Sequence, residues 1–87
     1  MVRAGERYRH YKGKVVEVET VAIAPTNALK GQEIWIDVVA TDDVKGGEKI
    51  VVYSEMDICI PRWARPLRIF EAVLGKTTRF YRFEKIA

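Results

Sequence analysis

The chain is divided into short runs of β-favouring residues, and each run ends near glycine, proline, asparagine or aspartate. Residues 14–23 place Val16 and Val18 on one face and Glu17 and Glu19 on the other, which is the alternation of a half-buried strand. No apolar run is longer than about four residues, whereas a membrane helix needs roughly 20. The pattern predicts several short strands and no membrane-spanning segment.

Further strands are expected on both sides of this run. Residues 25–31 predict a long loop, because proline cannot donate to a β-ladder and Asn and Gly favour turns. Residues 33–40 and 48–53 are expected to pair as an antiparallel hairpin, with Asp42 and Asp43 in its loop. The remaining β-favouring or extended segments are residues 7–11, 58–63 and 77–86.

Only one segment has helical spacing. Pro66 suits the first position of a helix, and Leu67, Phe70, Val73 and Leu74 then share one face before Gly75. We therefore expect one helix, over residues 66–74.

Chain length and element pattern together predict the fold class. A length of 87 residues allows one domain, residues 1–87, and composition is that of a folded globular chain. Five or six short antiparallel strands closing on themselves, with one short helix, predict an all-β fold: a small SH3-like barrel, with an OB-like barrel as the alternative. We find no internal repeat in the sequence.

Charge is unevenly distributed along the chain. Residues 1–14 carry five bases and one acid, residues 15–61 carry three bases and nine acids, and residues 62–87 carry seven bases and two acids. If the two ends meet, they form a positive face opposite an acidic one. The alternative is that these charges pair with each other on the surface.

Histidine and cysteine are too few for most catalytic or metal chemistry. The single His10 and the single Cys59 cannot build a zinc site, and isoleucines flank the cysteine, which favours a buried, unreactive thiol. We expect no metal, no cofactor, no enzymatic activity and no disulfide. A cytoplasmic location is expected from the cysteine usage and from an N-terminal stretch without an apolar signal segment.

Basic and aromatic residues alternate in three segments, and seven of the nine aromatic residues lie in the two basic end portions. Guanidinium groups bind phosphate and aromatic faces stack on bases, so this mixture is typical of nucleic-acid and nucleotide surfaces. The alternative is that the aromatics are core residues covered by arginine stems. The candidate ligand-binding residues are Arg7, Arg9, His10, Tyr11, Lys12, Trp63, Arg65, Arg68, Arg79, Tyr81 and Arg82.

The same segments resemble a family of short bacterial and phage proteins known as domain of unknown function 1653. The resemblance rests on Tyr8-Arg9-His10-Tyr11-Lys12-Gly13, Val51-Val52-Tyr53, Trp63-Ala64-Arg65-Pro66-Leu67 with Phe70, and Arg79-Phe80-Tyr81-Arg82-Phe83. It covers most of the chain except residues 25–37, where the link between strands is longer than the family pattern and contains Trp35. The resemblance implies a small β fold and no particular activity.

Two functions fit these observations. The first is a non-enzymatic binding module whose basic-aromatic face holds a phosphate-bearing ligand, either nucleic acid or a nucleotide. It requires the first and last strands to be neighbours, with Arg7 and Arg9 on one face and the acidic middle of the chain on the far side. The alternative is a protein-interaction or regulatory domain that docks on an acidic partner or forms a homo-oligomer through exposed strand edges. Trp63 is expected to anchor its turn in the core.

Overall fold

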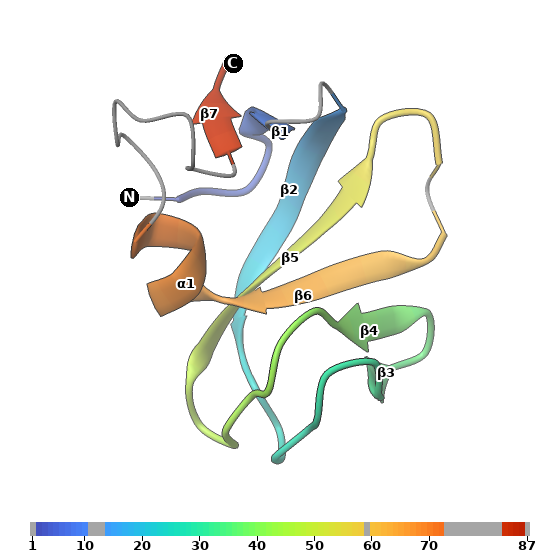
Figure 1. The fold of residues 1–87 in the computed structure, drawn as a ribbon, viewed down its shortest axis with the longest axis vertical. Helices are drawn as coiled ribbons and strands as arrows, with labels where there is room; N and C mark the ends of the chain where they lie inside the picture. Colours follow the sequence, from blue (N-terminus) through green and yellow to red (C-terminus); the bar gives the residue numbers. More distant parts are fainter. Residues whose placement is uncertain (1, 11–13, 59, 73–82, 87) are drawn as a thin grey trace.

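A single mixed sheet makes up most of the molecule (Figure 1). The computed structural model describes residues 2–10, 14–58, 60–72 and 83–86. Its strands lie side by side in the order β3-β4-β6-β5-β2-β1-β7, and β4 with β6 is the one parallel pair among the described strands. The elements are β1 (Arg7–His10), β2 (Val15–Ile23), β3 (Glu33–Trp35), β4 (Val38–Ala40), β5 (Lys49–Glu55), β6 (Arg62–Pro66), α1 (Leu67–Ala72) and β7 (Phe83–Lys85).

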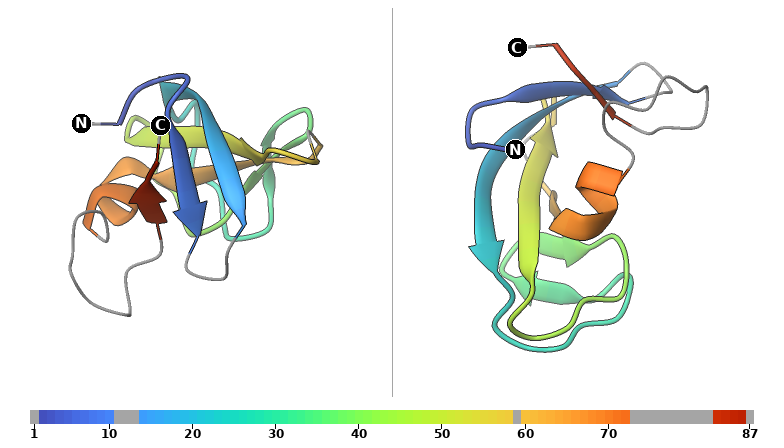
Figure 2. Two further views of the ribbon diagram at one scale, coloured as in Figure 1. Left: turned by 90° about the horizontal axis from the view of Figure 1, so that it is seen from above. Right: turned by 90° about the vertical axis from the view of Figure 1, so that its left-hand side faces the viewer.

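The sheet curls into a half-barrel, which is seen from two further sides in Figure 2. Within the described ranges its end strands β3 and β7 do not pair with each other, so the curl stays open. The predicted fold class, all-β with one short helix, is confirmed, whereas the predicted closure of the strands on themselves is not seen among the described strands. The sheet is mixed where the sequence predicted antiparallel pairing throughout.

The helix begins one residue later than predicted. Pro66 is the last residue of β6, and α1 begins at the next residue, while residues 73 and 74 lie outside the described chain. Phe70, on the inner face of α1, is fully buried, and its ring meets the Tyr8 ring edge-on at 5.2 Å between centroids. The aromatic contact fixes the helix against β1.

The predicted hairpin of residues 33–40 with 48–53 is wrong. The chain reverses at Ile36 and Asp37, so β3 and β4 form a hairpin of their own, and β4 then pairs with β6. Asp37 adopts a φ of 61°, a left-handed conformation that aspartate tolerates better than most residues. The alternation of Ile34, Ile36 and Val38 continues across this turn, so it does not reveal the reversal.

Strand β5 is buried on both faces and separates two apolar clusters. Val51 and Tyr53 point into the first cluster, while Ile50 and Val52 point into the second. The first cluster also contains Val2, Tyr8, Val16, Val18 and Phe70; the second contains Ala24, Ala28, Val38, Ala40, Val44 and Ala64. Four of the eight residues in the second cluster are alanines, which allow the backbones around them to approach closely.

Three tight turns share one design, and each leads directly into a strand. They span residues 2–6, 28–32 and 44–48, and β1, β3 and β5 follow them. In each turn a buried apolar residue comes first, glycine is fourth with a φ of 86°, 89° or 88°, and Glu or Gln is fifth. The fifth residue's side chain accepts a hydrogen bond from the backbone N–H of the second: Glu6 from Arg3 at 2.8 Å, Gln32 from Leu29 at 2.7 Å and Glu48 from Lys45 at 2.7 Å. The positive φ matches the third position of a type II turn, which favours glycine.

The second and third turns contact each other through reciprocal hydrogen bonds, as two halves related by a local two-fold axis do. Ala28 and Val44 exchange N–H to carbonyl bonds of 2.9 and 2.8 Å. Lys30 N–H donates to Asp43 Oδ1 at 3.0 Å, and Gly46 N–H, the counterpart of Lys30 sixteen positions later, donates to Asn27 Oδ1 at 2.8 Å. Two further pairs of backbone hydrogen bonds, each from an N–H to a carbonyl, obey the same relation. The bond from Gly31 to Ala40 corresponds to the bond from Gly47 to Ala24, and the bond from Ala24 to Glu48 corresponds to the bond from Ala40 to Gln32. The two turns lie together at the lower end of the sheet in Figure 1.

This reciprocity is an internal structural repeat, which corrects the expectation of none. Only a few aligned positions are identical, including Ala24 with Ala40 and Gly31 with Gly47, so identity alone hides the repeat. The sequence does contain one pattern that could have revealed the turns: an apolar residue, then glycine three positions later, then Glu or Gln directly after the glycine. This pattern occurs in all three turns. The repeat ends after Ile34 and Ile50, since β3 then turns at Ile36 whereas β5 continues to Glu55.

Candidate binding surfaces

The predicted basic face has the expected backbone arrangement. β1 pairs with β7, with Tyr8 opposite Lys85, so the first and last strands are neighbours, as predicted. Tyr8 is 2% exposed, while Arg7 and Arg9 are exposed on the opposite face of β1. Alternation along β1 therefore presents two arginines on one surface.

Several predicted ligand-binding residues lie outside the described chain: Tyr11, Lys12, Arg79, Tyr81 and Arg82, together with the side chain of His10. Cys59 also lies outside it. These assignments remain predictions from the sequence.

The acidic middle of the chain does not occupy a far side, so that part of the prediction is wrong. Each of the five ion pairs found in the described part of the chain joins a base of the end portions to an acid of residues 15–61. The pairs are Arg7 with Glu17, Lys14 with Glu55, Arg62 with Glu19, Arg65 with Asp42 and Arg68 with Glu48. Acidic strand β2 lies beside basic strand β1, so the charges of opposite sign meet instead of separating.

Arg65 is a buried structural residue. It is 7% exposed, its Nε lies 3.4 Å from the Tyr53 hydroxyl and its Nη1 lies 3.2 Å from Asp42 Oδ2. Asp42 also accepts a hydrogen bond from the Thr41 hydroxyl at 2.8 Å. A buried guanidinium held in this way positions β6 against β4 and the loop after it, and leaves little of itself to contact a ligand.

Trp63 and Arg68 lie in different settings. Trp63 is half-buried and packs against the first apolar cluster, in agreement with its expected anchoring role. Arg68 is exposed on α1, and its Nε lies 3.0 Å from Glu48 Oε1. The pair joins α1 to the third turn.

Tyr8 ties the first turn to the core. Its hydroxyl donates a 2.8 Å hydrogen bond to Glu6 Oε1, the same oxygen that accepts from Arg3 N–H. Burial, followed by the hydrogen bond to the Glu6 carboxylate, raises the pKa of Tyr8 well above its ordinary value. The phenol is therefore a structural donor at neutral pH.

Large apolar side chains are exposed at one end of the sheet, where β5 ends and β4 and β6 begin, a feature that the sequence analysis missed. Eight large hydrophobic residues are exposed in the described part of the chain, and five of them lie in two segments: the end of β3 with the turn after it, and the β5–β6 loop. We call these five the apolar ridge: Trp35, Ile36, Met56, Ile58 and Ile60. Ile36 is the most exposed, at 82%.

The two segments of the ridge adjoin each other. Arg62 N–H donates to the Asp37 carbonyl at 2.7 Å, and Arg62 Nη2 donates to the Ile36 carbonyl at 3.2 Å. Because β4 and β6 are parallel with Val38 opposite Arg62, Ile36 and Ile60 precede the same end of two neighbouring strands. Figure 1 shows both segments along the right-hand edge of the molecule.

A groove continues from the ridge toward β1. It has a volume of about 690 Å³, and Met56, Ile58 and Ile86 supply its apolar lining with Val15. Arg7, Lys14, Glu55 and Asp57 surround these residues. The groove thus joins the ridge to the part of the predicted basic face that the structure describes.

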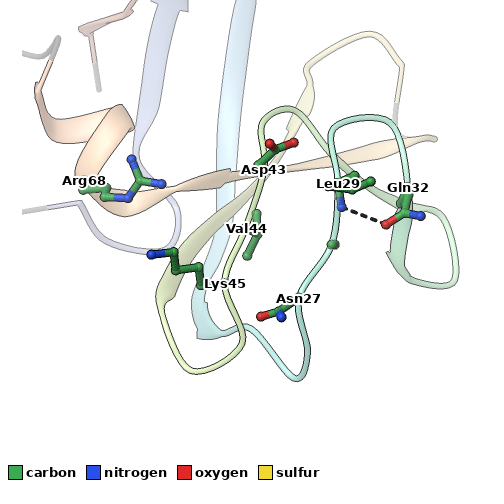
Figure 3. Close-up of a pocket in the computed structure, with 8 residues that line it drawn as sticks. Asn27, Leu29, Gln32, Asp43, Val44, Lys45 and Arg68 are labelled. Atoms are coloured by element: carbon green, nitrogen blue, oxygen red, sulfur yellow. Dashed lines mark hydrogen bonds between the residues drawn. The ribbon is translucent and has the colours of Figure 1, made fainter.

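A smaller pocket of about 190 Å³ lies between the second and third turns and α1 (Figure 3). Lys45, Arg68 and Asp43 supply its charges, and Leu29 and Val44 are among its apolar residues. Its side-chain oxygens serve the turns: Asn27, Gln32 and Asp43 each accept a hydrogen bond from a backbone N–H. The pocket is therefore a by-product of the turn pair more than an organised ligand site.

Residues able to form a metal site are absent from the described ranges, where no three His, Cys, Asp or Glu side chains cluster. Nor does any helix within those ranges have the length and apolar character needed to cross a membrane. Comparison with protein-family models, curated proteins and solved structures finds no match for this chain.

Proposed function

We propose that the protein is a non-enzymatic interaction module that binds a partner protein through the apolar ridge and the adjoining groove. One observation carries the proposal: five large apolar side chains from two adjoining segments are exposed on a protein that buries its other apolar side chains mainly in two clusters. Grouped exposed apolar side chains are typical of protein-binding surfaces, whereas isolated ones are ordinary.

The charges favour a protein partner over a polyanion. Arg7 and Lys14 at the groove each have a carboxylate within 3.4 Å, and Arg62 and Arg68 are also paired. A phosphate backbone would have to displace these acids, whereas an apolar partner side chain can enter the groove and leave the pairs in place. Arg7 and Lys14 then serve as a polar rim around an apolar centre.

A phosphate-bearing ligand on the outer face of β1 is the second candidate. It is supported by Arg9, which is exposed beside Arg7 and has no ion pair among the described residues. It is opposed by the pairing of Lys14, Arg62 and Arg68 with acids.

Site-specific photocrosslinking separates the candidates. A photoreactive residue replaces Ile58 in the ridge or Ile23 at another end of the sheet; the two isoleucines are 52% and 55% exposed, which makes them a matched pair. In cells of the natural source, discrete protein adducts from position 58 and none from position 23 are expected. Equal adducts from both, or none from position 58, would remove the ridge as the binding surface.

The second candidate is tested by titration with single-stranded DNA, RNA and nucleotides at low salt. Saturable binding that is lost in Arg9→Ala and kept in Ile58→Lys would favour the phosphate-bearing ligand over the partner protein. Such binding should weaken steeply with added salt, because each neutralised phosphate releases counterions.

A further inference from the structure

Strand β3 is an exposed edge of the sheet. Among the described strands it pairs only with β4, so its other side is not paired. Edge strands usually carry features that prevent pairing with other chains. Here the strand is short, but it ends in Trp35, 39% exposed, followed by Ile36, so the protection is incomplete.

The internal repeat shows what a strand in this position can accept. β5, the counterpart of β3, has β2 on one side and β6 on the other, with Ile50 opposite Pro66 and Val51 opposite Arg65. Beside β3, strand β4 takes the place that β2 takes beside β5. No described strand takes the place of β6 on the other side of β3. The open side of β3 therefore corresponds to a position that is filled in the second copy.

The charges around this edge are acidic. Glu33 is exposed and its side chain accepts a hydrogen bond from Asp37 N–H at 3.2 Å, which brings the Glu33 carboxylate to the turn that contains Asp37. Neither residue has an ion pair in the described ranges, and the nearby Arg62 is paired with Glu19 at 2.7 Å. The edge combines apolar side chains with unneutralised negative charge.

We propose that β3 accepts an extended segment of the partner protein as an additional antiparallel strand, and that this segment is apolar and basic. This inference rests on the proposed function and specifies its mode of binding. The register of β3 against β4 shifts between Glu33 and Trp35, yet both side chains are exposed. In an added antiparallel strand the residues opposite Trp35 and Glu33 are two apart. The recognised pattern is therefore an apolar residue, any residue, then Lys or Arg, read from N- to C-terminus.

A second copy of this chain fits the edge less well. Pairing of β3 with its own copy about a two-fold axis at Ile34 would place each Glu33 opposite a Trp35, so neither Glu33 would gain a cation as its cross-strand partner. A basic segment supplies the missing charge, and cross-strand pairs of opposite charge stabilise an antiparallel pair.

The test uses two capped peptides that differ at one residue. One contains Val-Thr-Lys and the other Val-Thr-Glu, each flanked by two threonines, and binding is followed by amide chemical shifts of the isotope-labelled protein. The Lys peptide should shift the amides of residues 33–36 saturably at millimolar concentration. The Glu peptide should bind roughly three- to fivefold more weakly, the value of one cross-strand charge pair.

Charge exchange makes the test specific. In Glu33→Lys the order of the two peptides should reverse, whereas Glu71→Lys, an equal charge change at an exposed position of α1, should leave it unchanged. No shifts at residues 33–36, or an unchanged order in Glu33→Lys, would overturn strand addition. Shifts at these residues that depend on protein concentration without peptide would also overturn it, since they would assign the edge to a second copy.

The two proposals fail in different ways. If the Ile58 crosslinks appear and the peptide test fails, the interaction function stands and strand addition is removed. If both fail, the ridge is not a protein-binding surface.

Discussion

The end of the sheet that contains the second and third turns differs from the end that carries the apolar ridge in how its strands terminate. Where β2 ends and β5 begins, small residues are buried and backbone groups are satisfied by reciprocal hydrogen bonds between the second and third turns. Where β5 ends and β6 begins, Met56, Ile58 and Ile60 extend into solvent. Apolar side chains stabilise the fold at the first end and are left exposed at the second.

The difference separates residues that can be replaced freely from residues that cannot. In a domain of this size the core is small, so each buried side chain contributes a large share of the stability. The ridge residues contribute little to it, because they stay exposed in the folded protein. The predictions below test this separation, beginning with the largest expected effect.

The first prediction compares two isoleucines. Ile50 is 0% exposed in the second apolar cluster, and Ile50→Ala should lower the free energy of unfolding by about 2 to 5 kcal/mol through lost burial and a cavity. Ile58→Ala should change it by less than about 0.5 kcal/mol. Urea denaturation measures both, and comparable losses would mean that the ridge belongs to the core.

The second prediction concerns the turn glycines. Gly31→Ala and Gly47→Ala each force a side chain into a positive φ, of 89° and 88°, and each should cost about 1 to 2 kcal/mol. Because the two positions are equivalent in the repeat, the two losses should be similar. Lys30→Ala, at an exposed neighbouring position with ordinary φ, is the control for the denaturation measurements, and strongly unequal losses would show that the two turns are not energetically equivalent.

The third prediction concerns the hydrogen bonds that link those turns. Asn27→Ala and Asp43→Ala each remove a side-chain acceptor from a backbone N–H of the other turn, at 2.8 and 3.0 Å. Each should cost about 1 kcal/mol. A double-mutant cycle should show coupling, because both substitutions loosen the same contact; strict additivity would argue against a cooperative turn pair.

The fourth prediction extends the comparison to the first turn and has the smallest effect at neutral pH. The raised pKa of Tyr8 means that the folded state holds the phenol proton more tightly than the unfolded state. This contribution to stability is complete below the ordinary tyrosine pKa of about 10 and is lost as the pH rises above it. Tyr8→Phe should therefore lose less stability than the wild type above pH about 10.

Thermal denaturation from neutral to alkaline pH checks this. At neutral pH Tyr8→Phe should cost about 0.5 to 1 kcal/mol for the lost bond to Glu6. Parallel curves for the two proteins above pH about 10 would contradict the role given to Tyr8.

Local patterns predicted the elements well. The alternation of Val16 and Val18 with Glu17 and Glu19 identifies β2, and the spacing of Leu67 and Phe70 identifies α1. The neighbouring positions of β1 and β7 also followed from sequence, since a curled sheet brings the ends of the chain together.

Non-local features were not predictable in the same way. The parallel pairing of β4 with β6 depends on residues far apart in sequence, and the turn at Asp37 interrupts no hydrophobic pattern. The ridge was missed because Ile58 and Ile60 have the composition of core residues, and only the fold determines which isoleucines find a neighbour to pack against. The distribution of charge along the sequence also predicted a separate basic face. The strand order instead places Glu17 beside Arg7, and this cannot be read from the sequence.

The reciprocal contact between the second and third turns has a consequence for crowded solutions. Each turn meets the other as one subunit of a symmetric dimer meets its copy, with both halves supplied by a single polypeptide. If the segment before β4 opens, a turn of one chain can bind the complementary turn of another through an identical set of bonds. The fold therefore allows domain-swapped dimers. In such a dimer every hydrogen bond of this contact is kept, but the two turns that form the contact come from different chains.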